Sequence, residues 1–357
     1  MIVHTDCRHY RGDVPCKPHK DNGVHCQGCP RFEQTREKIL IVKLGAIGDV
    51  IRTTPLLRRL KEAYPKAQIH WLTHTPEVLP KWVDRLFRFR PEDIETVRAT
   101  PYDVVYSLDK DREACAIAGA VNAKIKKGYI LKEGACWPLD EPARRKWITG
   151  LFDDENRKNT KSYPREIFEI CGFEFRGEEY VLDDPPRQAW DLPEEAPVVG
   201  LNTGCGPRWK SRLWPDAYWI ETASRLRTMG WTVLFLGGEQ EHGKNLAMAQ
   251  STGGRYFGHF PLPVFMDLVN RCGLVVTAVT MALHIAIGLR KKVVLFNNVF
   301  NRHEFEMYGR GIILEPDRNC KGCFMADCDQ PCMDQIKPDA VLAAVQTLWS
   351  PEHGPTA

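Results

Sequence analysis

An acidic residue ends a short glycine-containing motif, GAIGD, at residues 45–49. The motif lies between an apolar run of strand length, residues 38–44, and a segment with helical spacing. Gly45 and Gly48 let the backbone turn tightly and approach a ligand, while the start of the following helix offers free N–H groups to an anion. Asp49 is therefore suited to cap that helix, or to act as a general base at the mouth of a ligand cleft.

A second strand-to-helix turn follows residues 198–202 and carries Thr203, Gly204 and Lys210. The hydroxyl and backbone groups could donate to phosphate, and a lysine could neutralise a diphosphate. The alternative for Lys210 is an ordinary solvated loop lysine. Thr203, Gly204 and Lys210 are thus candidate residues for binding the anionic part of a nucleotide.

Two further turns lie where parallel strands of an α/β sheet end, which is where such sheets bind ligands. After the run WTVLFL come Gly237, Gly238 and Glu241, whose carboxylate could accept from ribose hydroxyls or could simply stabilise a helix start. After LVVTAV come the remaining candidate ligand-binding residues, which are Thr280, Met281 and His284. A histidine in so apolar a segment is more often a satisfied core residue than a catalyst.

Eight of the thirteen cysteines form two groups near the ends of the chain. The N-terminal group is Cys7, Cys16, Cys26 and Cys29, and the C-terminal group is Cys320, Cys323, Cys328 and Cys332. In a reducing compartment such clusters favour a metal over disulfides, so we expect zinc or iron, including an iron–sulfur cluster, in a structural role. Reduced thiols without metal are the alternative, and the two groups could also share one site.

The elements that must position these residues alternate between strands and helices, which predicts parallel sheets. Strands are expected at 68–73, 103–108, 123–130 and 198–202, and helices at about 50–65, 216–229 and 338–349. The proline-rich stretch 183–197 cannot continue a helix or a central strand and is assigned as a linker. The predicted divisions are a Cys/His-rich metal-binding segment 1–37, Rossmann-like domains 38–183 and 198–336, the linker core 184–197, and a helix with tail 337–357.

Composition excludes several classes of protein. A net charge of only +3 does not indicate the strong positive potential that would attract nucleic acid. No apolar run reaches the roughly 18–20 residues of a membrane span. No signal peptide pattern opens the chain, so we expect a cytoplasmic protein. The basic stretch 124–127 favours a solvated strand end, with peripheral contact to an anionic lipid surface as the alternative.

Taken together, KILIVKLGAIGDVIRTTPLLRRLKEAYP, TGCGPRWKSRLWP, LFLGGEQE and TMALHIAIGLRKKVVLF resemble successive blocks of glycosyltransferase family 9, the ADP-heptose:lipopolysaccharide heptosyltransferases. The resemblance implies an α/β protein of GT-B fold, with two Rossmann-like domains facing a cleft. It implies inverting transfer of a sugar, heptose above all, from an ADP-sugar to a hydroxyl of a glycan or lipid-linked acceptor. It implies no catalytic metal. Peripheral contact with the cytoplasmic face of the inner membrane is an alternative to a purely cytoplasmic location.

The resemblance also implies residue roles. Asp49 would be the base, Lys210 would hold the donor diphosphate, Glu241 would meet the ribose, and the Thr280–Met281 backbone would support phosphate. The sequence departs from the family pattern at Val279, which replaces an acid thought to hold the donor sugar, and at residues 297–298, where Asn-Asn replaces Gly-Pro. A different donor sugar is therefore an alternative.

Three other functions remain open from the sequence. The first is a catalytically weakened protein that binds a nucleotide sugar, which Val279 motivates. The second is a metal or iron–sulfur protein on a Rossmann-like scaffold, which the cysteine content motivates. A nicotinamide oxidoreductase is third, and the lack of a GxGxxG fingerprint speaks against it.

Overall fold

The computed structural model describes residues 1–193, 196–318, 320, 322–330 and 332–350. Contacts divide the chain into two compact units. The first unit comprises residues 1–45, 55–147 and 167–174, and the second comprises 46–54, 148–166 and 175–357. This division differs from the sequence-based boundaries because two short segments, 46–54 and 148–166, pack with the C-terminal part of the chain.

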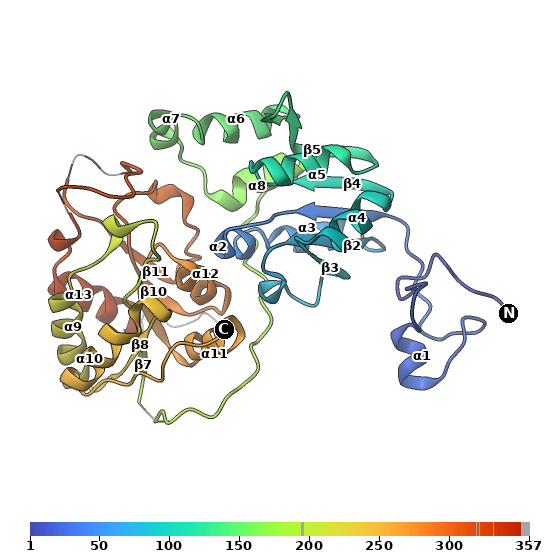
Figure 1. Ribbon diagram of the computed structural model, residues 1–357. Coiled ribbons are helices and arrows are strands. Elements are labelled where there is room, and N and C mark those ends of the chain that lie inside the picture. Colours follow the sequence, from blue (N-terminus) through green and yellow to red (C-terminus); the bar gives the residue numbers. More distant parts are fainter. Residues whose placement is uncertain (194–195, 319, 321, 331, 351–357) are drawn as a thin grey trace. The chain divides into compact units, whose positions relative to one another are not determined.

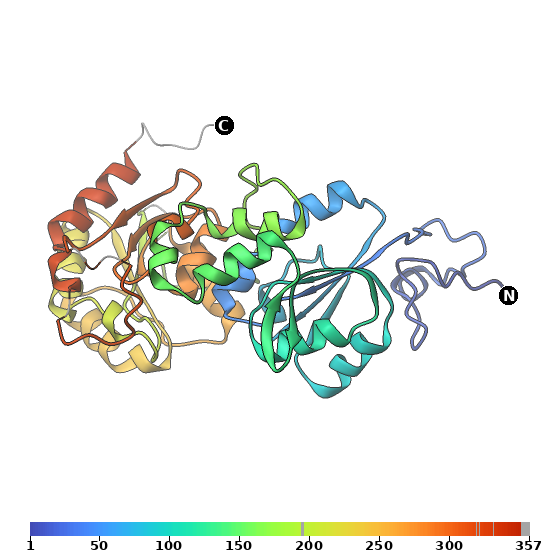
Figure 2. The same ribbon diagram turned by 90° about the horizontal axis from the view of Figure 1, so that it is seen from above.

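The first unit contains a six-stranded sheet of order β3-β2-β1-β4-β5-β6 (Figure 1). Its strands are β1 (Lys38–Val42), β2 (Gln68–Thr73), β3 (Arg85–Arg88), β4 (Tyr102–Ser107), β5 (Ala123–Lys132) and β6 (Ala135–Pro138). All pairs are parallel except the β5–β6 hairpin. Figure 2 shows α3 (Leu56–Ala63) on one face of this sheet and α4 (Pro91–Ala99) with α5 (Arg112–Ala120) on the other. This placement follows from right-handed crossovers between parallel strands.

The second unit contains a five-stranded, fully parallel sheet of order β11-β10-β9-β7-β8. Its strands are β7 (Val198–Asn202), β8 (Thr232–Leu236), β9 (Leu274–Ala278), β10 (Lys292–Phe296) and β11 (Gly311–Leu314). Its helices include α2 (Ile47–Ile51), α7 (Asp153–Lys158), α9 (Asp216–Thr228), α10 (His242–Thr252), α11 (Leu262–Arg271), α12 (Met281–Gly288) and α13 (Pro338–Trp349). The helices α6 (Glu141–Thr149) and α8 (Tyr163–Cys171) each have residues in both units.

The core of the second unit lies between its sheet and the helices α9, α10 and α13. Trp219 on α9, Met248 on α10 and Val345 on α13 share one cluster of buried side chains with Phe296 of β10. The Trp219 and Phe296 rings lie 5.6 Å apart, within the range of favourable aromatic contacts. This packing holds the sheet rigid, so the loops that follow its strands are positioned by a fixed frame.

Most predicted elements are confirmed, with one correction. The strands at 68–73 and 198–202 and the helix at 338–349 have the expected bounds, and the tail beyond 350 lies outside the described residues. The helix expected over 50–65 is wrong as a single element, because α2 ends at Ile51 and α3 begins at Leu56. Pro55 has no N–H to continue the helical hydrogen bonds, so the chain turns between the two helices.

The N-terminal segment forms little regular structure. It contains the six-residue helix α1 (Lys17–Asn22) and an isolated bridge between Cys7 and Gln34. Its apolar residues Ile2, Val3 and Val14 are each more than half exposed. A segment that buries so little apolar surface needs another source of stability. Within the described residues, no helix combines the length and apolar character needed to cross a membrane.

Candidate functional site

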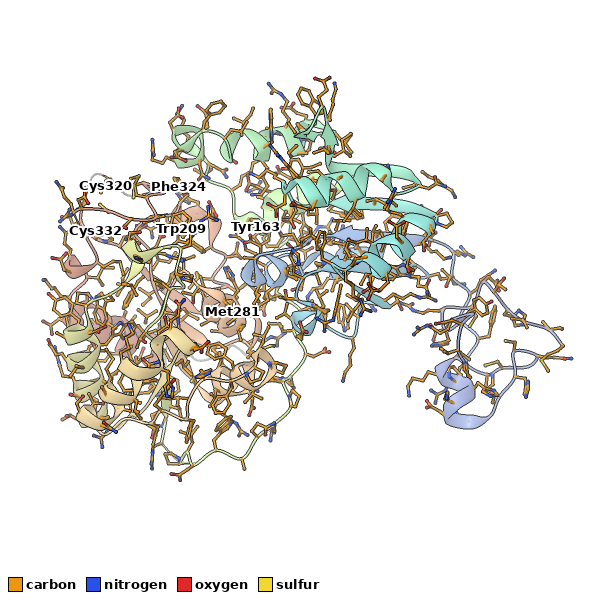
Figure 3. All side chains as sticks on the ribbon, in the orientation of Figure 1. Tyr163, Trp209, Met281, Cys320, Phe324 and Cys332 are labelled. Carbon is orange, nitrogen blue, oxygen red and sulfur yellow. The ribbon has the colours of Figure 1, made fainter. Side chains whose placement is uncertain are left out.

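A cavity of about 830 Å³ lies within the second unit, at the carboxyl ends of its strands. Loops that follow β7, β8, β9 and β10 line it together with α2. Trp209 and Met281, two of its lining residues, are marked in Figure 3. Open parallel sheets bind their ligands at this edge, so the position alone favours a ligand site.

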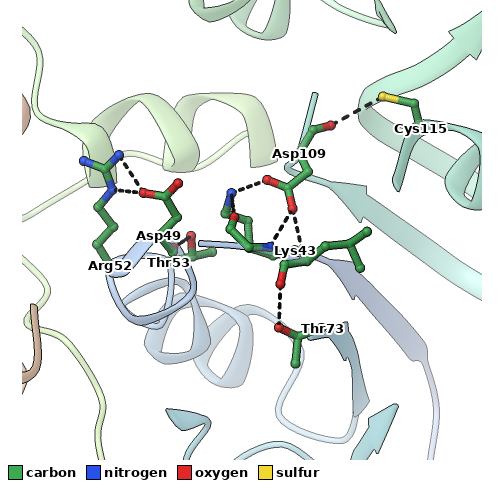
Figure 4. A network of polar contacts seen from close by, with 9 residues as sticks. Lys43, Asp49, Arg52, Thr53, Thr73, Asp109 and Cys115 are labelled. Atoms are coloured by element: carbon green, nitrogen blue, oxygen red, sulfur yellow. Dashed lines mark hydrogen bonds and ion pairs between the residues drawn. The ribbon is translucent and has the colours of Figure 1, made fainter. Parts of the chain in front are cut away.

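Asp49 lines this cavity and is held by an arginine from its own helix (Figure 4). The Arg52 Nη2 lies 2.8 Å from the Asp49 Oδ1, and its Nε lies 2.9 Å from the same oxygen. The Asp49 side chain is 34% exposed and that of Arg52 only 12%. The predicted base is therefore accessible from the cavity, and Arg52, which is less exposed, lines the cavity beside it.

Arg52 also contacts two residues from other elements of the second unit. Its guanidinium stacks 3.6 Å from the centre of the Tyr163 ring, and its Nη1 lies 3.5 Å from the Glu304 Oε2. Burial disfavours the charged guanidinium, but Asp49, Tyr163 and Glu304 outweigh it and raise the pKa of Arg52 above its ordinary value. Arg52 therefore stays charged and bridges two carboxylates of the cavity.

The helix α2 packs directly on α12 through Gly48 and His284. A Cβ atom on Gly48 would overlap the His284 ring, so only glycine allows this approach. His284 is 5% exposed, and burial together with the nearby Arg52 lowers its pKa to about 3. The imidazole is therefore neutral at physiological pH, and its Nδ1 has no hydrogen-bond partner among the described residues.

In the first unit, a buried carboxylate that the sequence did not suggest holds the turn at Gly45 (Figure 4). Asp109 accepts hydrogen bonds from the Lys43 Nζ and the Leu44 N–H, and its Oδ2 lies 3.4 Å from the Gly45 nitrogen. It is 5% exposed. A buried carboxylate that accepts from a cationic side chain and from backbone N–H groups has its hydrogen bonds satisfied, so Asp109 fixes the start of the predicted motif.

The loop after β7 is braced internally. The Asn202 Nδ2 donates to the Gly204 carbonyl and to the Thr277 hydroxyl, at 3.2 and 3.0 Å. The Thr203 hydroxyl donates to the Asn245 Oδ1 at 2.6 Å, and Thr203 is not among the residues that line the cavity. Gly204 does line it. The loop thus presents backbone to the cavity, while the Thr203 side chain serves its structure.

Glu241 lies at the predicted place after β8, in the cavity with Gly237 and Gly238. Its Oε2 accepts a hydrogen bond of 2.9 Å from the Gly238 N–H. A Cβ atom on Gly204 would overlap the Glu241 carboxylate, so glycine at 204 permits the close approach of the two loops. The structure therefore brings Gly204, Gly237, Gly238 and Glu241 together.

The two cations of the three-residue turn Lys210–Arg212 are placed differently. Lys210 is exposed and is not among the residues that line the cavity, whereas Arg212 lines it and is 7% exposed. The Arg212 guanidinium donates to the Cys205 carbonyl at 2.7 Å and to the Val279 carbonyl. Both acceptors are neutral, and burial lowers the pKa of Arg212 to about 10.

Arg212 has no acidic partner in the part of the chain that the structure describes, and its Nε donates to none of those residues. The Trp209 and Phe300 rings flank it at 5.6 and 5.5 Å. A buried cation without a counter-ion is costly, which points to an anionic ligand. Sequence reasoning missed Arg212 because Lys210 lies two positions away and spacing cannot say which of them is buried.

The turn between β9 and α12 brings Val279, Thr280 and Met281 to the cavity. Thr280 precedes the first residue of α12 in extended conformation, and its hydroxyl lies 3.1 Å from that of Thr277. The N-terminus of α12 is therefore at the cavity, where its backbone N–H groups favour an anion.

The cysteine groups lie apart from this cavity. All four N-terminal cysteines line a separate space of about 290 Å³, with His4, His9, His19 and His25. In the C-terminal group, burial raises the pKa of Cys332, with further contributions from nearby Cys320 and Cys323. Among the described residues, no three His, Cys, Asp or Glu side chains are arranged to hold a metal. Residues 319, 321 and 331, which neighbour these cysteines in the sequence, lie outside the described part.

Comparison with known proteins gives consistent matches. Lipopolysaccharide heptosyltransferase 1 of Pseudomonas aeruginosa is 26% identical over 217 residues, which are 55% of this chain and 59% of that protein. The chain thus spans about three fifths of that relative's length. Among solved structures, a family 9 glycosyltransferase of Veillonella parvula has a TM-score of 0.69 at 18% identity, covering 89% of this chain and 98% of the other.

Two further structures share the fold. The ADP-heptose lipopolysaccharide heptosyltransferase II of Escherichia coli has a TM-score of 0.64 at 17% identity, covering 87% and 98% of the two chains. The iron-containing dodecameric glycosyltransferase TibC of enterotoxigenic E. coli has a TM-score of 0.57 at 17% identity, covering 88% and 76%. These likenesses confirm the predicted GT-B fold.

A sequence profile of glycosyltransferase family 9 (heptosyltransferase) matches residues 93–333, which is more than half of the chain. The match covers the turns after β7, β8 and β9 that form the cavity. The chain therefore belongs to glycosyltransferase family 9, the heptosyltransferase family.

Proposed function

We propose that this protein transfers a heptosyl group from ADP-heptose to a hydroxyl of a lipopolysaccharide-type acceptor, with inversion at the anomeric carbon. One observation carries the proposal: an accessible carboxylate, Asp49, and a buried cation without an acidic partner among the described residues, Arg212, line the same cavity. A glycosyl transfer needs a base and a site for a departing diphosphate, and the cavity supplies both.

On the donor side, Arg212 and the N-terminus of α12 would hold the diphosphate, with the Gly204 backbone beside it. The leaving nucleotide gains negative charge as the glycosidic bond breaks. A buried guanidinium and fixed backbone N–H groups stabilise that charge without having to reorganise. Glu241 would accept a hydrogen bond from a ribose hydroxyl at the adjoining loop. Lys210 stays an expectation from family resemblance and has less structural support than Arg212.

On the acceptor side, Asp49 would take the proton of the attacking hydroxyl. The hydroxyl oxygen forms a bond to the anomeric carbon while the bond from that carbon to the diphosphate oxygen breaks. The electron pair leaves with ADP, and the proton passes to Asp49. Arg52 would orient the carboxylate throughout. One direct displacement of this kind inverts the anomeric centre.

The experiment that tests the proposal is calorimetric titration with ADP, UDP and GDP, followed by a transfer assay with ADP-heptose and lipid A carrying inner-core sugars. Selective binding of ADP and formation of a heptosylated product would support it. Binding of ADP without transfer to any such acceptor would support a protein that only binds nucleotide sugars. Absence of nucleotide binding would overturn the proposal.

We also propose that the cysteine groups bind structural metal. Thiolate sets suit zinc and iron, the four N-terminal thiols share one small cavity, and the segment around them buries little apolar surface. The iron named for TibC supports iron as one candidate. Zinc or iron bound here would cross-link the cysteine-containing segments and so stabilise the fold. The proposed transfer reaction uses no metal.

Elemental analysis of the purified protein tests the metal proposal. Cys26→Ser with Cys29→Ser should lower the metal content per chain and the melting temperature, whereas Cys272→Ser, a buried cysteine outside both groups, should keep the wild-type metal content. Metal-free wild-type protein, purified without chelators, would contradict the proposal.

We further propose a cytoplasmic protein with peripheral membrane contact through the β5–β6 hairpin of the first unit. Trp137 is 45% and Leu139 39% exposed, and the Lys132 Nζ lies 4.8 Å from the Trp137 ring centre. Residues 124–146 carry seven Lys or Arg against three acids. An exposed indole beside basic residues fits an anionic lipid surface. Trp137→Ala should reduce sedimentation with phosphatidylglycerol vesicles, whereas Leu246→Ala, equally exposed elsewhere, should leave it unchanged.

A further inference from the structure

The loop that follows β10 brings the acidic side chain of Glu304 to the cavity. The sequence pattern did not suggest this residue, and the proposed mechanism gives it no role. β9 and β10 are adjacent parallel strands, with Ala278 paired to Phe296 at their carboxyl ends. The segments after them therefore emerge side by side at the ligand edge of the sheet. β9 is followed by Val279, which has no polar side-chain atom, whereas the β10 loop supplies Glu304.

Hydrogen bonds brace the β10 loop next to Glu304. The Asn301 Nδ2 donates to the Asn156 and Asn159 carbonyls at 2.6 and 2.7 Å, and its Oδ1 accepts from the His303 N–H at 3.0 Å. Asn301 is buried and opens the short turn η4 (Arg302–Glu304). A side chain carried on a loop with satisfied internal hydrogen bonds is preorganised for binding.

Glu304 lies next to the reacting centre. Its Oε2 is 3.5 Å from the Arg52 Nη1, and the same guanidinium contacts Asp49 at 2.8 Å. The side chain is 16% exposed, so it is largely shielded but still part of the cavity lining. The transferred sugar must lie between the base and the diphosphate, because its anomeric carbon reacts with one and separates from the other. Glu304 is thus at the wall of that space.

The other acids of the cavity have different positions. Asp49 is the proposed base on the acceptor side and contacts Arg52 at 2.8 Å, and the Glu241 carboxylate accepts from the Gly238 N–H at the loop after β8. Glu239 is exposed beside that same loop. Among the described residues that line the cavity, Glu304 is therefore the acid placed to meet the sugar itself. Phe305, buried next to it, adds the apolar surface that ligand pockets combine with a few polar groups.

We propose that Glu304 accepts hydrogen bonds from hydroxyl groups of the donor sugar and so selects a neutral, polyhydroxylated sugar. A carboxylate accepts from two hydroxyls at once, whereas it repels the carboxylate of an acidic sugar. This inference rests on the proposed function, since it places the sugar of the same nucleotide donor. It gives the sugar subsite a residue from β10 where β9 provides only Val279.

The test is a pair of titrations without acceptor, one with ADP and one with ADP-heptose, on wild type, Glu304→Ala, Glu304→Gln and Glu306→Gln. Glu306 is two residues further along the same loop and is not among the residues that line the cavity. Glu304→Ala should weaken ADP-heptose binding about tenfold or more, the usual range for hydrogen bonds to a charged group, and leave ADP binding unchanged. The affinity of Glu304→Gln for ADP-heptose should lie between those of Glu304→Ala and wild type, and the affinity of Glu306→Gln should equal that of wild type.

Retained ADP binding shows that each variant is folded and that the diphosphate site is intact. Equal ADP-heptose affinity in wild type and Glu304→Ala overturns the inference. Parallel loss of ADP and ADP-heptose binding also overturns it, because Glu304 would then act only through the structure of the cavity. Wild-type protein that binds neither ligand removes the proposed function itself, which is a different result from a variant-specific change.

Discussion

The carboxylate of Asp49 is held by Arg52 at 2.8 Å, three residues further along the chain. Both Nε and Nη2 of the guanidinium contact the same oxygen, Oδ1. The stack on Tyr163 and the contact with Glu304 keep Arg52 in place from two other elements. An arginine held by contacts with three residues orients the carboxylate, which a general base needs before the substrate arrives.

Asp49→Asn should abolish transfer while leaving nucleotide binding intact. The amide keeps the shape of the side chain but cannot accept the proton of the attacking hydroxyl. General-base catalysis contributes roughly 10²–10⁴-fold, so kcat should fall by at least about a hundredfold. The measurement is the rate of product formation together with ADP affinity by calorimetry. Unchanged kcat would remove Asp49 from the base role.

Arg212→Gln should weaken ADP binding, and Lys210→Gln should not. Arg212 is buried at the cavity without an acidic partner among the described residues, whereas Lys210 is exposed and does not line the cavity. Losing a charge-assisted contact to a diphosphate costs about 1.5–3 kcal/mol. Titration of both variants with ADP decides between them. If Lys210→Gln weakened ADP binding and Arg212→Gln did not, Lys210 would be the residue that holds the diphosphate, as the family resemblance implied.

Much of the frame of this site could be predicted from the sequence. The apolar run before GAIGD, the restart at 198–202 and the glycines at 237–238 mark strand ends, and the structure has strands ending at each. Short-range periodicity and turn residues determine such features. The final helix, Pro338–Trp349, was predictable for the same reason, since its apolar spacing and initial proline are local signals.

The burial and pairing of the side chains in the site depend on contacts between residues distant in sequence. Arg212 rather than Lys210 is buried because its guanidinium meets Phe300, on the loop after β10, and the Val279 carbonyl after β9. Glu304 carries no motif and becomes notable only because Arg52 lies beside it. Spacing cannot reveal such pairings, and neither could it show that α2 packs on α12 in the second unit.

Gly48→Ala should impair both stability and transfer. The added methyl group would overlap the His284 ring where α2 packs on α12, and overpacking of this kind usually costs about 1–3 kcal/mol. Any shift of α2 also moves Asp49, the next residue. Thermal unfolding and kcat measure the two effects. Gly243→Ala is the matched control, because it lies in α10 with no atom within 4 Å of the added carbon. Equal melting temperatures for the two variants would contradict the tight contact.

Lowering the pH from 7 to 5 should destabilise the folded protein through two buried histidines. Burial is the main reason why the pKa values of His70 and His284 are lowered from 6.5 to about 3. Above pH 6.5 both histidines are neutral in the folded and in the unfolded protein, so their effect on stability does not change with pH. Below it only the unfolded chain takes up protons, so each histidine removes about 1.4 kcal/mol of stability per pH unit until the pH approaches 3.

The histidine variants separate this effect from general acid denaturation. His70→Gln should melt with a smaller difference between pH 7 and pH 5 than wild type, because one buried group that gains a proton only on unfolding is gone. His303→Gln, an exposed position, should keep the wild-type difference. The melting temperatures of all three proteins at both pH values give the comparison. If the melting temperature of His70→Gln differed between pH 7 and pH 5 as much as that of wild type, the imidazole of His70 would be protonated in the folded protein as readily as in the unfolded chain.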